Sequence, residues 1–221
     1  MRRFECSAIL FDLDGVLVDS AAFVETQWRR WASARGLRAE PFLRVCHGRR
    51  ALETIRLAAP HLDAEAEVRA FVPQDAGEES PGAYEGASRL LRALPVGSWG
   101  IATSGLRVSA TARLRLAGLP VPEVLICAED VTRGKPSPEP YLVAAAALGV
   151  SPESCVVIED APAGIEGARA AGMTVIGLAT THSSDQLPAD VCAQTLGGVH
   201  VGRVDRDPRG RWRVEVLIVE A

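Results

Sequence analysis

The stretch Phe11-Asp12-Leu13-Asp14-Gly15 follows directly on an apolar run that begins at Ala8. Such a run predicts a buried β-strand over residues 7–12, with Asp12 at its carboxyl end. Open α/β sheets bind their ligands at that end of the strands. Asp14 then falls in the following turn, where Gly15 lets the backbone bend. Because a single Asp-Gly pair often marks only a turn, a functional interpretation needs partners elsewhere in the chain.

The composition is that of a soluble, globular protein. Of the 221 residues, 48% are hydrophobic and 24% are charged, which suits one large domain or a core with a smaller attached domain. The formal net charge of −4 predicts no general attraction to nucleic acid or to anionic membranes, so an anionic substrate needs a local binding site. We expect a monomer.

Hydropathy and cysteine usage predict a cytoplasmic location. No apolar run reaches the length of a membrane span, and the first residues lead into a strand instead of a signal-peptide cleavage region. The five cysteines are an odd number without Cys-x-x-Cys spacing, which predicts reduced and mostly buried thiols.

The segment that follows the first strand shows helical spacing and no strand pattern. Apolar residues recur at helical intervals over residues 22–36, 51–59 and 64–72. About sixty residues are too long for a simple crossover between parallel strands, which normally needs one helix. We therefore predict an all-helical cap over residues 19–84, inserted into a core of residues 1–18 and 85–221, with a return linker over residues 73–81.

From residue 85 onward, helices and strands alternate in units of similar length. We predict strands over residues 98–103, 124–127, 155–158 and 174–178, and helices over residues 85–94, 108–117, 138–148 and 161–171. Repeated units of this kind indicate a parallel sheet with helices on both faces. Residues 199–204 and 212–219 predict a C-terminal β-hairpin that extends or covers this sheet.

Two polar motifs after predicted strands have the chemistry of a phosphate site. Thr103-Ser104-Gly105 stands at a helix entrance, where hydroxyl and free N–H groups bind phosphate, although such residues also serve as helix caps. Lys135 lies between Gly134 and Pro136 in a loop that prolines stiffen. An isolated lysine is usually solvated surface, but a lysine held in this way is suited to neutralising phosphoryl charge.

A third motif, Glu159-Asp160, ends another buried strand. Adjacent carboxylates suit Mg²⁺, which prefers oxygen ligands and is usually held by one or two carboxylates with water and substrate phosphate. The alternative is that Asp160 only caps the helix that follows.

Together these motifs resemble the four signatures of the haloacid dehalogenase superfamily, and the match spans nearly the whole core. The signatures stand here as Asp12-Leu13-Asp14-Gly15, Thr103-Ser104-Gly105, Lys135-Pro136 and Glu159-Asp160. The resemblance implies a Rossmann-like α/β core with a helical cap inserted after the first motif, as in the C1-capped phosphatases. That agrees with the cap predicted from the pattern alone.

The resemblance also implies roles for the two aspartates of the first motif. Asp12 would be the nucleophile that takes the phosphoryl group as an aspartyl-phosphate. Asp14 would protonate the leaving alkoxide and then activate the hydrolytic water. The presence of Asp14 favours phosphatase or phosphomutase chemistry over dehalogenation, because the dehalogenases lack an acid at that position.

Phosphate and metal ligands follow from the same resemblance. Thr103, Ser104, Gly105 and Lys135 would hold the phosphoryl oxygens. Asp12, the carbonyl of Asp14 and Asp160 would bind Mg²⁺, with Glu159 as a direct or indirect ligand. The partner would be a small phosphorylated metabolite.

The sharpest feature of the predicted cap is His47-Gly48-Arg49-Arg50, a glycine-centred turn with basic groups. It is either a solvated helix start or a specificity loop that contacts substrate when the cap closes. With the core motifs, it is similar to the glycerol phosphatase and 2-deoxyglucose-6-phosphate phosphatase branch, which implies small polyol or sugar phosphates as substrates.

Two alternatives stay open. β-Phosphoglucomutase shares the core motifs and the cap type, but the cap histidine that restrains its acid/base aspartate has no counterpart in residues 21–25. A non-catalytic binding module on a degenerate scaffold should have lost at least one chemical position, and none of the four motifs is damaged here.

Overall fold

A six-stranded parallel sheet forms the centre of the molecule in the computed structural model, which describes residues 1–71 and 81–219. Its strand order is β4-β3-β2-β5-β6-β7, and every neighbouring pair runs parallel. The strands are β2 (Ala8–Phe11), β3 (Trp99–Ala102), β4 (Leu125–Ile126), β5 (Cys155–Glu159), β6 (Thr174–Leu178) and β7 (Val191–Ala193). The predicted parallel α/β sheet is confirmed, although the three-residue β7 was not predicted.

The strand order places β2 at the middle of the sheet. From β2 the chain moves outward to β3 and β4, and then returns to β5 on the other side of β2. Strand order therefore reverses between β2 and β5, and the carboxyl ends of strands at such a point form the crevice in which α/β sheets bind ligands.

Helices cover both faces of this sheet because successive side chains of a strand point to opposite faces. On one face, Leu10 and Val157 share an apolar cluster with α7 (Glu139–Ala147) and α8 (Pro162–Ala170). On the other face, Phe11 and Ile158 share a cluster with α5 (Ala87–Ala93) and α6 (Arg107–Leu116). Strands that are covered on both faces have continuous apolar sequences, and the central strands of this sheet do. Short 3-10 turns span Ala128–Asp130, Pro152–Ser154, Ser184–Gln186 and Leu196–Gly198.

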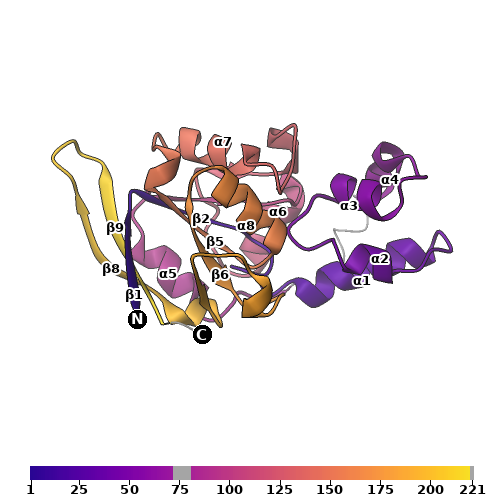
Figure 1. Cartoon of the computed structure of the whole chain (residues 1–221), viewed down its shortest axis with the longest axis horizontal. Coiled ribbons are helices and arrows are strands. Elements are labelled where there is room, and N and C mark those ends of the chain that lie inside the picture. Colours follow the sequence, from indigo (N-terminus) through magenta and orange to yellow (C-terminus); the bar gives the residue numbers. More distant parts are fainter. Residues whose placement is uncertain (72–80, 220–221) are drawn as a thin grey trace.

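A second, antiparallel sheet lies at the end of the molecule far from the helical lobe (Figure 1). Its order is β1-β9-β8, formed by β1 (Arg2–Cys6), β8 (Val199–Arg206) and β9 (Trp212–Ile218). The predicted hairpin is therefore present. It covers the parallel sheet and does not extend it, since Val214 and Val216 belong to the same cluster as Phe11. Strand β1 was not predicted because its residues are mostly exposed and its partner lies at the other end of the chain.

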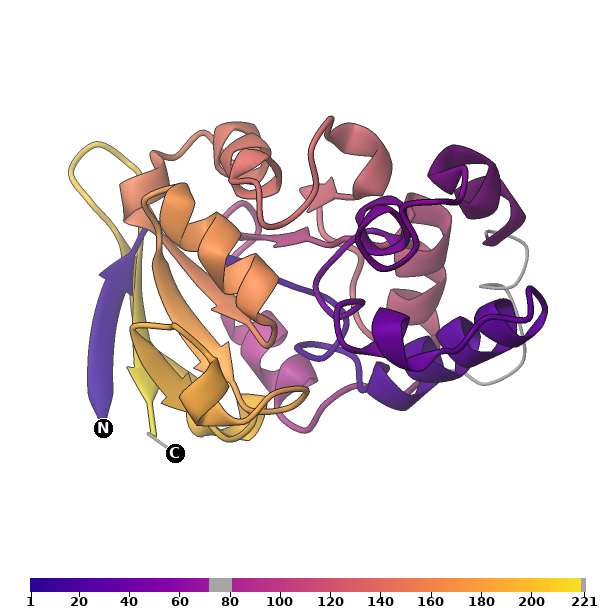
Figure 2. The same ribbon diagram turned by 45° about the vertical axis from the view of Figure 1, so that its right-hand side comes forward.

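Within the described ranges, four helices form a separate lobe beyond the carboxyl ends of the strands (Figure 2). They are α1 (Ala21–Ser33), α2 (Glu40–Leu43), α3 (Ala51–Ala58) and α4 (Ala64–Phe71), and they enclose an aromatic cluster of their own. The Trp28 ring stacks on Phe42 with 5.6 Å between centroids, and Trp31 meets Phe42 edge-on at 5.0 Å. The exact division into cap and core stays a prediction, and nearly all of the predicted return linker lies outside the described residues.

No described helix is both long and apolar enough to cross a lipid bilayer.

Candidate active site

The first motif lies at the switch point of the sheet. The N–H of Asp12 donates to the carbonyl of Ile158 at 3.0 Å, which ties the end of β2 to β5. Gly15 turns the chain back with φ of +82°, and a Cβ at this position would lie 2.1 Å from Oδ2 of Asp160. Only glycine allows that approach, so the turn of the first motif packs directly against Asp160, the acid that follows β5.

Lys135 is completely buried between two of the predicted site carboxylates. Its Nζ donates to Oδ1 of Asp12 at 2.8 Å and to Oε1 of Glu159 at 2.7 Å. The hydroxyl of Tyr141 donates to the same oxygen of Glu159 at 2.9 Å. Four side chains from separate parts of the sequence thus form one buried network.

Charge balance within this network shifts its pKa values. Burial favours the neutral amine, but the charges of Asp12 and Glu159 outweigh it, so the pKa of Lys135 lies well above its ordinary value. Burial raises the pKa of Asp12, although Lys135 opposes the shift. The lysine therefore stays charged beside the predicted nucleophile.

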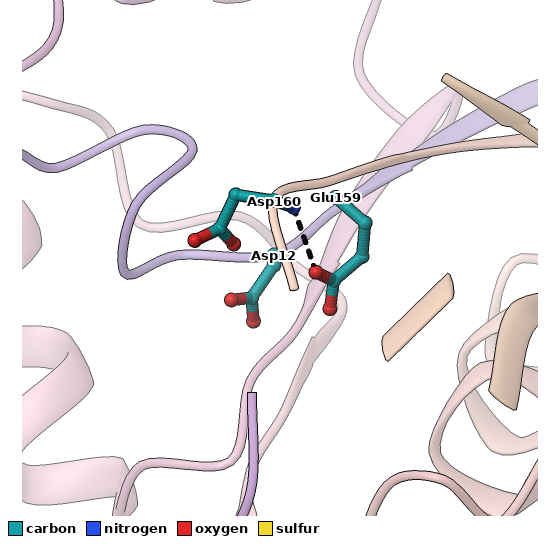
Figure 3. Close-up of side chains that lie close together, drawn as sticks. All are labelled: Asp12, Glu159 and Asp160. Carbon is teal, nitrogen blue, oxygen red and sulfur yellow. Dashed lines mark hydrogen bonds between the residues drawn. The ribbon is translucent and has the colours of Figure 1, made fainter. Parts of the chain in front are cut away.

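Glu159 faces away from the crevice and toward this lysine. Its Oε2 accepts from the backbone N–H groups of Asp160 at 2.8 Å and Ala161 at 2.9 Å, the first of which Figure 3 marks. A Cβ on Gly164 would lie 1.7 Å from Oε1 of Glu159, so the helix after the motif needs glycine there. These contacts fix Glu159 as the support of Lys135.

The three carboxylates at this edge fit a divalent cation. Oxygen atoms of Asp12, Glu159 and Asp160 all lie within 4.8 Å of one another. Oδ2 of Asp160 accepts from the Thr181 hydroxyl, but Oδ1 is buried and has no hydrogen-bond partner within the described ranges. Burial, with the charges of Glu159 and Asp12, raises the pKa of Asp160 well above its ordinary value. An unpaired carboxylate oxygen among like charges suits a hard cation, which Asp12 and Asp160 would hold.

Asp14 is held by a residue that the sequence did not point to. One guanidinium nitrogen of Arg113, Nη1, contacts both carboxylate oxygens of Asp14 at 2.8 and 2.7 Å. The hydroxyl of Ser20 donates to Oδ1 at 2.6 Å, and the Arg113 guanidinium also lies over the ring of Phe23 at 5.3 Å. Arg113 lies in the last turn of α6, 99 residues from Asp14, and no local motif marks it.

The second motif joins the same crevice. The hydroxyl oxygen of Thr103 accepts from the N–H of Gly105 at 3.1 Å, and the Ser104 hydroxyl donates to the carbonyl of Gly48 at 2.9 Å. Thr103, Ser104 and Gly105 all border the cavity that Asp12 faces. The Ser104 bond links this motif to the cap turn, so the helical lobe rests on the core.

Arg50 makes the firmest link between the cap and the core. Its Nη1 donates to the carbonyls of Ala128 at 3.1 Å and Val131 at 2.9 Å, and its Nη2 donates to the carbonyl of Thr132 at 3.0 Å. Its Nε lies 2.8 Å from Oε2 of Glu53. The Arg50 side chain, which belongs to the turn predicted to contact substrate, is thus engaged with the core and with Glu53.

The other members of the cap turn have different surroundings. Nε2 of His47 lies 3.7 Å from Glu25, and its ring meets His182 edge-on at 6.1 Å. A Cβ on Gly48 would lie 2.8 Å from Ala161, which makes this glycine a packing contact between cap and core. Arg49 borders the cavity, and its Nη1 donates to the nearby carbonyl of Val45 at 3.4 Å.

A cavity of about 270 Å³ lies between the two parts of the molecule. Asp12, Asp14 and the second motif line its floor. The cap lines it with Trp28, Phe71 and the polar side chain of Gln27. No sequence pattern marks Gln27, which lies in the first cap helix among the apolar residues that form the cap core. This cavity joins the predicted chemical groups to the predicted specificity region.

Comparison with known proteins agrees with this geometry. A family model described as haloacid dehalogenase-like hydrolase matches residues 6–172. Hexitol phosphatase A of Escherichia coli (strain K12) is 44% identical over 179 residues, covering 78% of this chain and 83% of that protein. Glycerol-1-phosphate phosphohydrolase 2 of Saccharomyces cerevisiae is 38% identical over 200 residues, covering 84% and 80% respectively. The crystal structure of a hydrolase from Pseudomonas syringae matches with a TM-score of 0.73 and 26% identity, covering 85% of this chain and 92% of that one.

These relatives confirm two predictions made from the motifs. The resemblance to the superfamily is confirmed by the family model, which spans all four signatures. Both relatives named above are phosphatases, which confirms the predicted class of enzyme, a phosphoric monoester hydrolase. The chain belongs to the haloacid dehalogenase-like hydrolases.

Proposed function

We propose that the protein is an Mg²⁺-dependent phosphatase that hydrolyses small sugar or polyol phosphate monoesters through an aspartyl-phosphate on Asp12. The observation that carries the proposal is the position of Asp12, which borders the cavity while Lys135 bonds it from behind. The names of two relatives, a hexitol phosphatase and a glycerol-1-phosphate phosphohydrolase, support polyol phosphates as the substrate class.

In the first step, the substrate phosphoryl group lies over Asp12. Thr103 and the Ser104 backbone bind its oxygens at the helix entrance, and Lys135 neutralises charge from the opposite side. A carboxylate oxygen of Asp12 attacks phosphorus, and the bond from phosphorus to the ester oxygen breaks. Asp14 gives its proton to the departing alkoxide, which leaves as the alcohol.

In the second step, Asp14 removes a proton from water, which attacks the phosphorus of the aspartyl-phosphate. The bond between phosphorus and the Asp12 oxygen breaks, inorganic phosphate leaves, and both aspartates return to their starting forms. Arg113 and Ser20 hold Asp14 beside the cavity, so one carboxyl group serves both steps.

The metal site of this proposal consists of Asp12, the Asp14 carbonyl and Asp160, with Glu159 acting through Lys135. Bound Mg²⁺ would supply positive charge to the phosphoryl oxygens. The support is the unpaired, buried Oδ1 of Asp160 beside Asp12.

Replacement of the nucleophile tests the proposal. Asp12→Asn keeps the size of the side chain, so the protein should fold with an unchanged circular dichroism spectrum while turnover of phosphate esters is lost. A phosphate-release screen over glycerol phosphates, hexitol phosphates, sugar phosphates, phosphoglycolate and nucleotides provides the readout. Undiminished turnover in Asp12→Asn contradicts the assignment.

The same preparation distinguishes a phosphatase from a phosphomutase. Incubation with β-glucose 1-phosphate and a bisphosphate primer should release inorganic phosphate. Formation of glucose 6-phosphate instead would support a mutase, and inactivity across the whole ester panel with Mg²⁺ would support a binding module.

A further inference from the structure

The helical lobe places the side chain of Gln27 at the cavity, where no described residue forms a hydrogen bond with its amide. Gln27 is only 5% exposed and borders the cavity from the second turn of α1. Among the described residues its side-chain amide has no hydrogen-bond partner, and the amide is not one of the buried unpaired groups, so it stays open to the cavity. An amide open to such a cavity is free to exchange water for a polar group of a ligand.

We propose that Gln27 binds a hydroxyl group at the end of the substrate remote from phosphate, and so selects polyol phosphates of about four to six carbons over shorter ones. This inference rests on the proposed function, because it names the substrate that the same site prefers.

The chemistry of the amide favours a neutral hydroxyl. A glutamine side chain offers both a hydrogen-bond donor and an acceptor. A hydroxyl group can bond to both, whereas a carboxylate or an ionised phosphate only accepts hydrogen bonds. Trp28 and Phe71 line the cavity beside Gln27 and suit the carbon chain. In such apolar surroundings a hydrogen bond is stronger than in water.

The distance from the chemical groups sets the length of the chain. Ser20 contacts Asp14 directly and immediately precedes α1, and Gln27 follows seven residues later. At 1.5 Å per helical residue, this separates the acid from Gln27 by about 10 Å along the helix axis. With carbon–carbon bonds of about 1.5 Å, a six-carbon polyol phosphate covers most of that span, but glycerol phosphate leaves the amide unpaired.

Arg49 is the main competitor for the remote end of the substrate. It borders the same cavity, and its known hydrogen bond is the long one to Val45. A site built around Arg49 would prefer substrates with a second anionic group, such as phosphoglycolate or a bisphosphate. The two residues therefore predict different preferences for the same pocket.

The test compares a hexitol phosphate with glycerol 1-phosphate in the wild type, in Gln27→Met and in Arg49→Met. Methionine keeps the length of glutamine and removes both hydrogen-bonding groups. Gln27→Met should lower kcat/KM for the hexitol phosphate about tenfold or more, because a polar site loses its partner, and change the value for glycerol phosphate by less than about twofold. Arg49→Met should leave the ratio of the two values unchanged.

Two further measurements make the result decisive. Calorimetry should measure the binding of both esters to Asp12→Asn, with and without Gln27→Met. Gln27→Met should weaken binding of the hexitol phosphate and leave that of glycerol 1-phosphate unchanged. Because this measurement needs no turnover, it tests the role of Gln27 even if the proposed chemistry is wrong. Gln27→Met should also melt no lower than the wild type without ligand, since the amide has no hydrogen bond to lose among the described residues. Equal effects on both esters, no effect on either, or a lower melting temperature would overturn the inference.

Discussion

The two sides of the cavity differ in how their polar groups are satisfied. On the core side, Asp12, Lys135 and Glu159 bond one another inside a buried network. On the cap side, the amide of Gln27 has no partner among the described residues and is open to the cavity beside aromatic rings. A saturated network fixes geometry before substrate arrives, as the chemical step requires. A polar group open to the cavity can exchange water for a hydroxyl of the ligand, which is how a cap can choose substrates while the chemistry stays the same.

Removal of the cation from the core network should have the largest effect. Lys135→Met leaves two buried carboxylates without their counter-charge, and we expect it to cost about 3 kcal/mol of unfolding free energy or more. Turnover should fall about a thousandfold, because a preorganised donor is lost. Urea unfolding and phosphate release measure the two effects.

The neighbouring Arg133 offers a matched control. Its side chain is 76% exposed and bonded only to Glu139 in the described structure, so Arg133→Met should change stability by less than about 0.5 kcal/mol. Similar stability losses in the two variants would show that the core network is no more organised than the surface.

A second prediction concerns the contact that joins the two sides. Arg50→Ala leaves three carbonyls of the core loop without their donor, and we expect a loss of about 2 kcal/mol together with a roughly hundredfold fall in kcat/KM. The kinetic effect arises because the cap no longer docks beside Lys135. Arg49→Ala is the control for stability, since its hydrogen bond stays within its own segment. If Arg50→Ala proved as stable and as active as the wild type, the docked cap would be irrelevant to catalysis.

The smallest predicted effect is the pH dependence of metal binding. Burial raises the pKa of Asp12 from 3.8 to about 7, and that of Asp160 is raised as well. In metal-free protein, a raised carboxyl pKa adds stability below the unfolded value of 3.8, and this stability is lost as pH rises through 7. Because Mg²⁺ binds the ionised forms, it should raise the melting temperature more at pH 8 than at pH 5.

Differential scanning fluorimetry with Mg²⁺ or EDTA checks this expectation. Asp160→Asn should lose most of the Mg²⁺ effect at pH 8. An equal gain at both pH values would argue against carboxylate ligands of raised pKa.

The sequence predicted the core far better than the cap, for a physical reason. Asp12 and Asp160 each follow a buried apolar strand, and parallel strands bring their carboxyl ends to one edge, so local patterns were sufficient. The bond from Arg113 to Asp14 and the place of Gln27 at the cavity depend on how distant helices pack, and no local signal marks either residue. Arg50 was noticed for its charge, but its contacts with a loop about eighty residues away emerge only from docking of the cap.

Trapping the phosphorylated enzyme tests directly whether Asp12 is the nucleophile. The protein is mixed with a rapidly hydrolysed polyol phosphate and Mg²⁺, quenched in acid during turnover, and analysed by peptide mass spectrometry. We predict one phosphoryl group on the peptide that contains Asp12, and none in Asp12→Asn. A phosphoryl group on another residue, or rapid phosphate release with no covalent adduct at any time, would contradict the role of Asp12 as nucleophile.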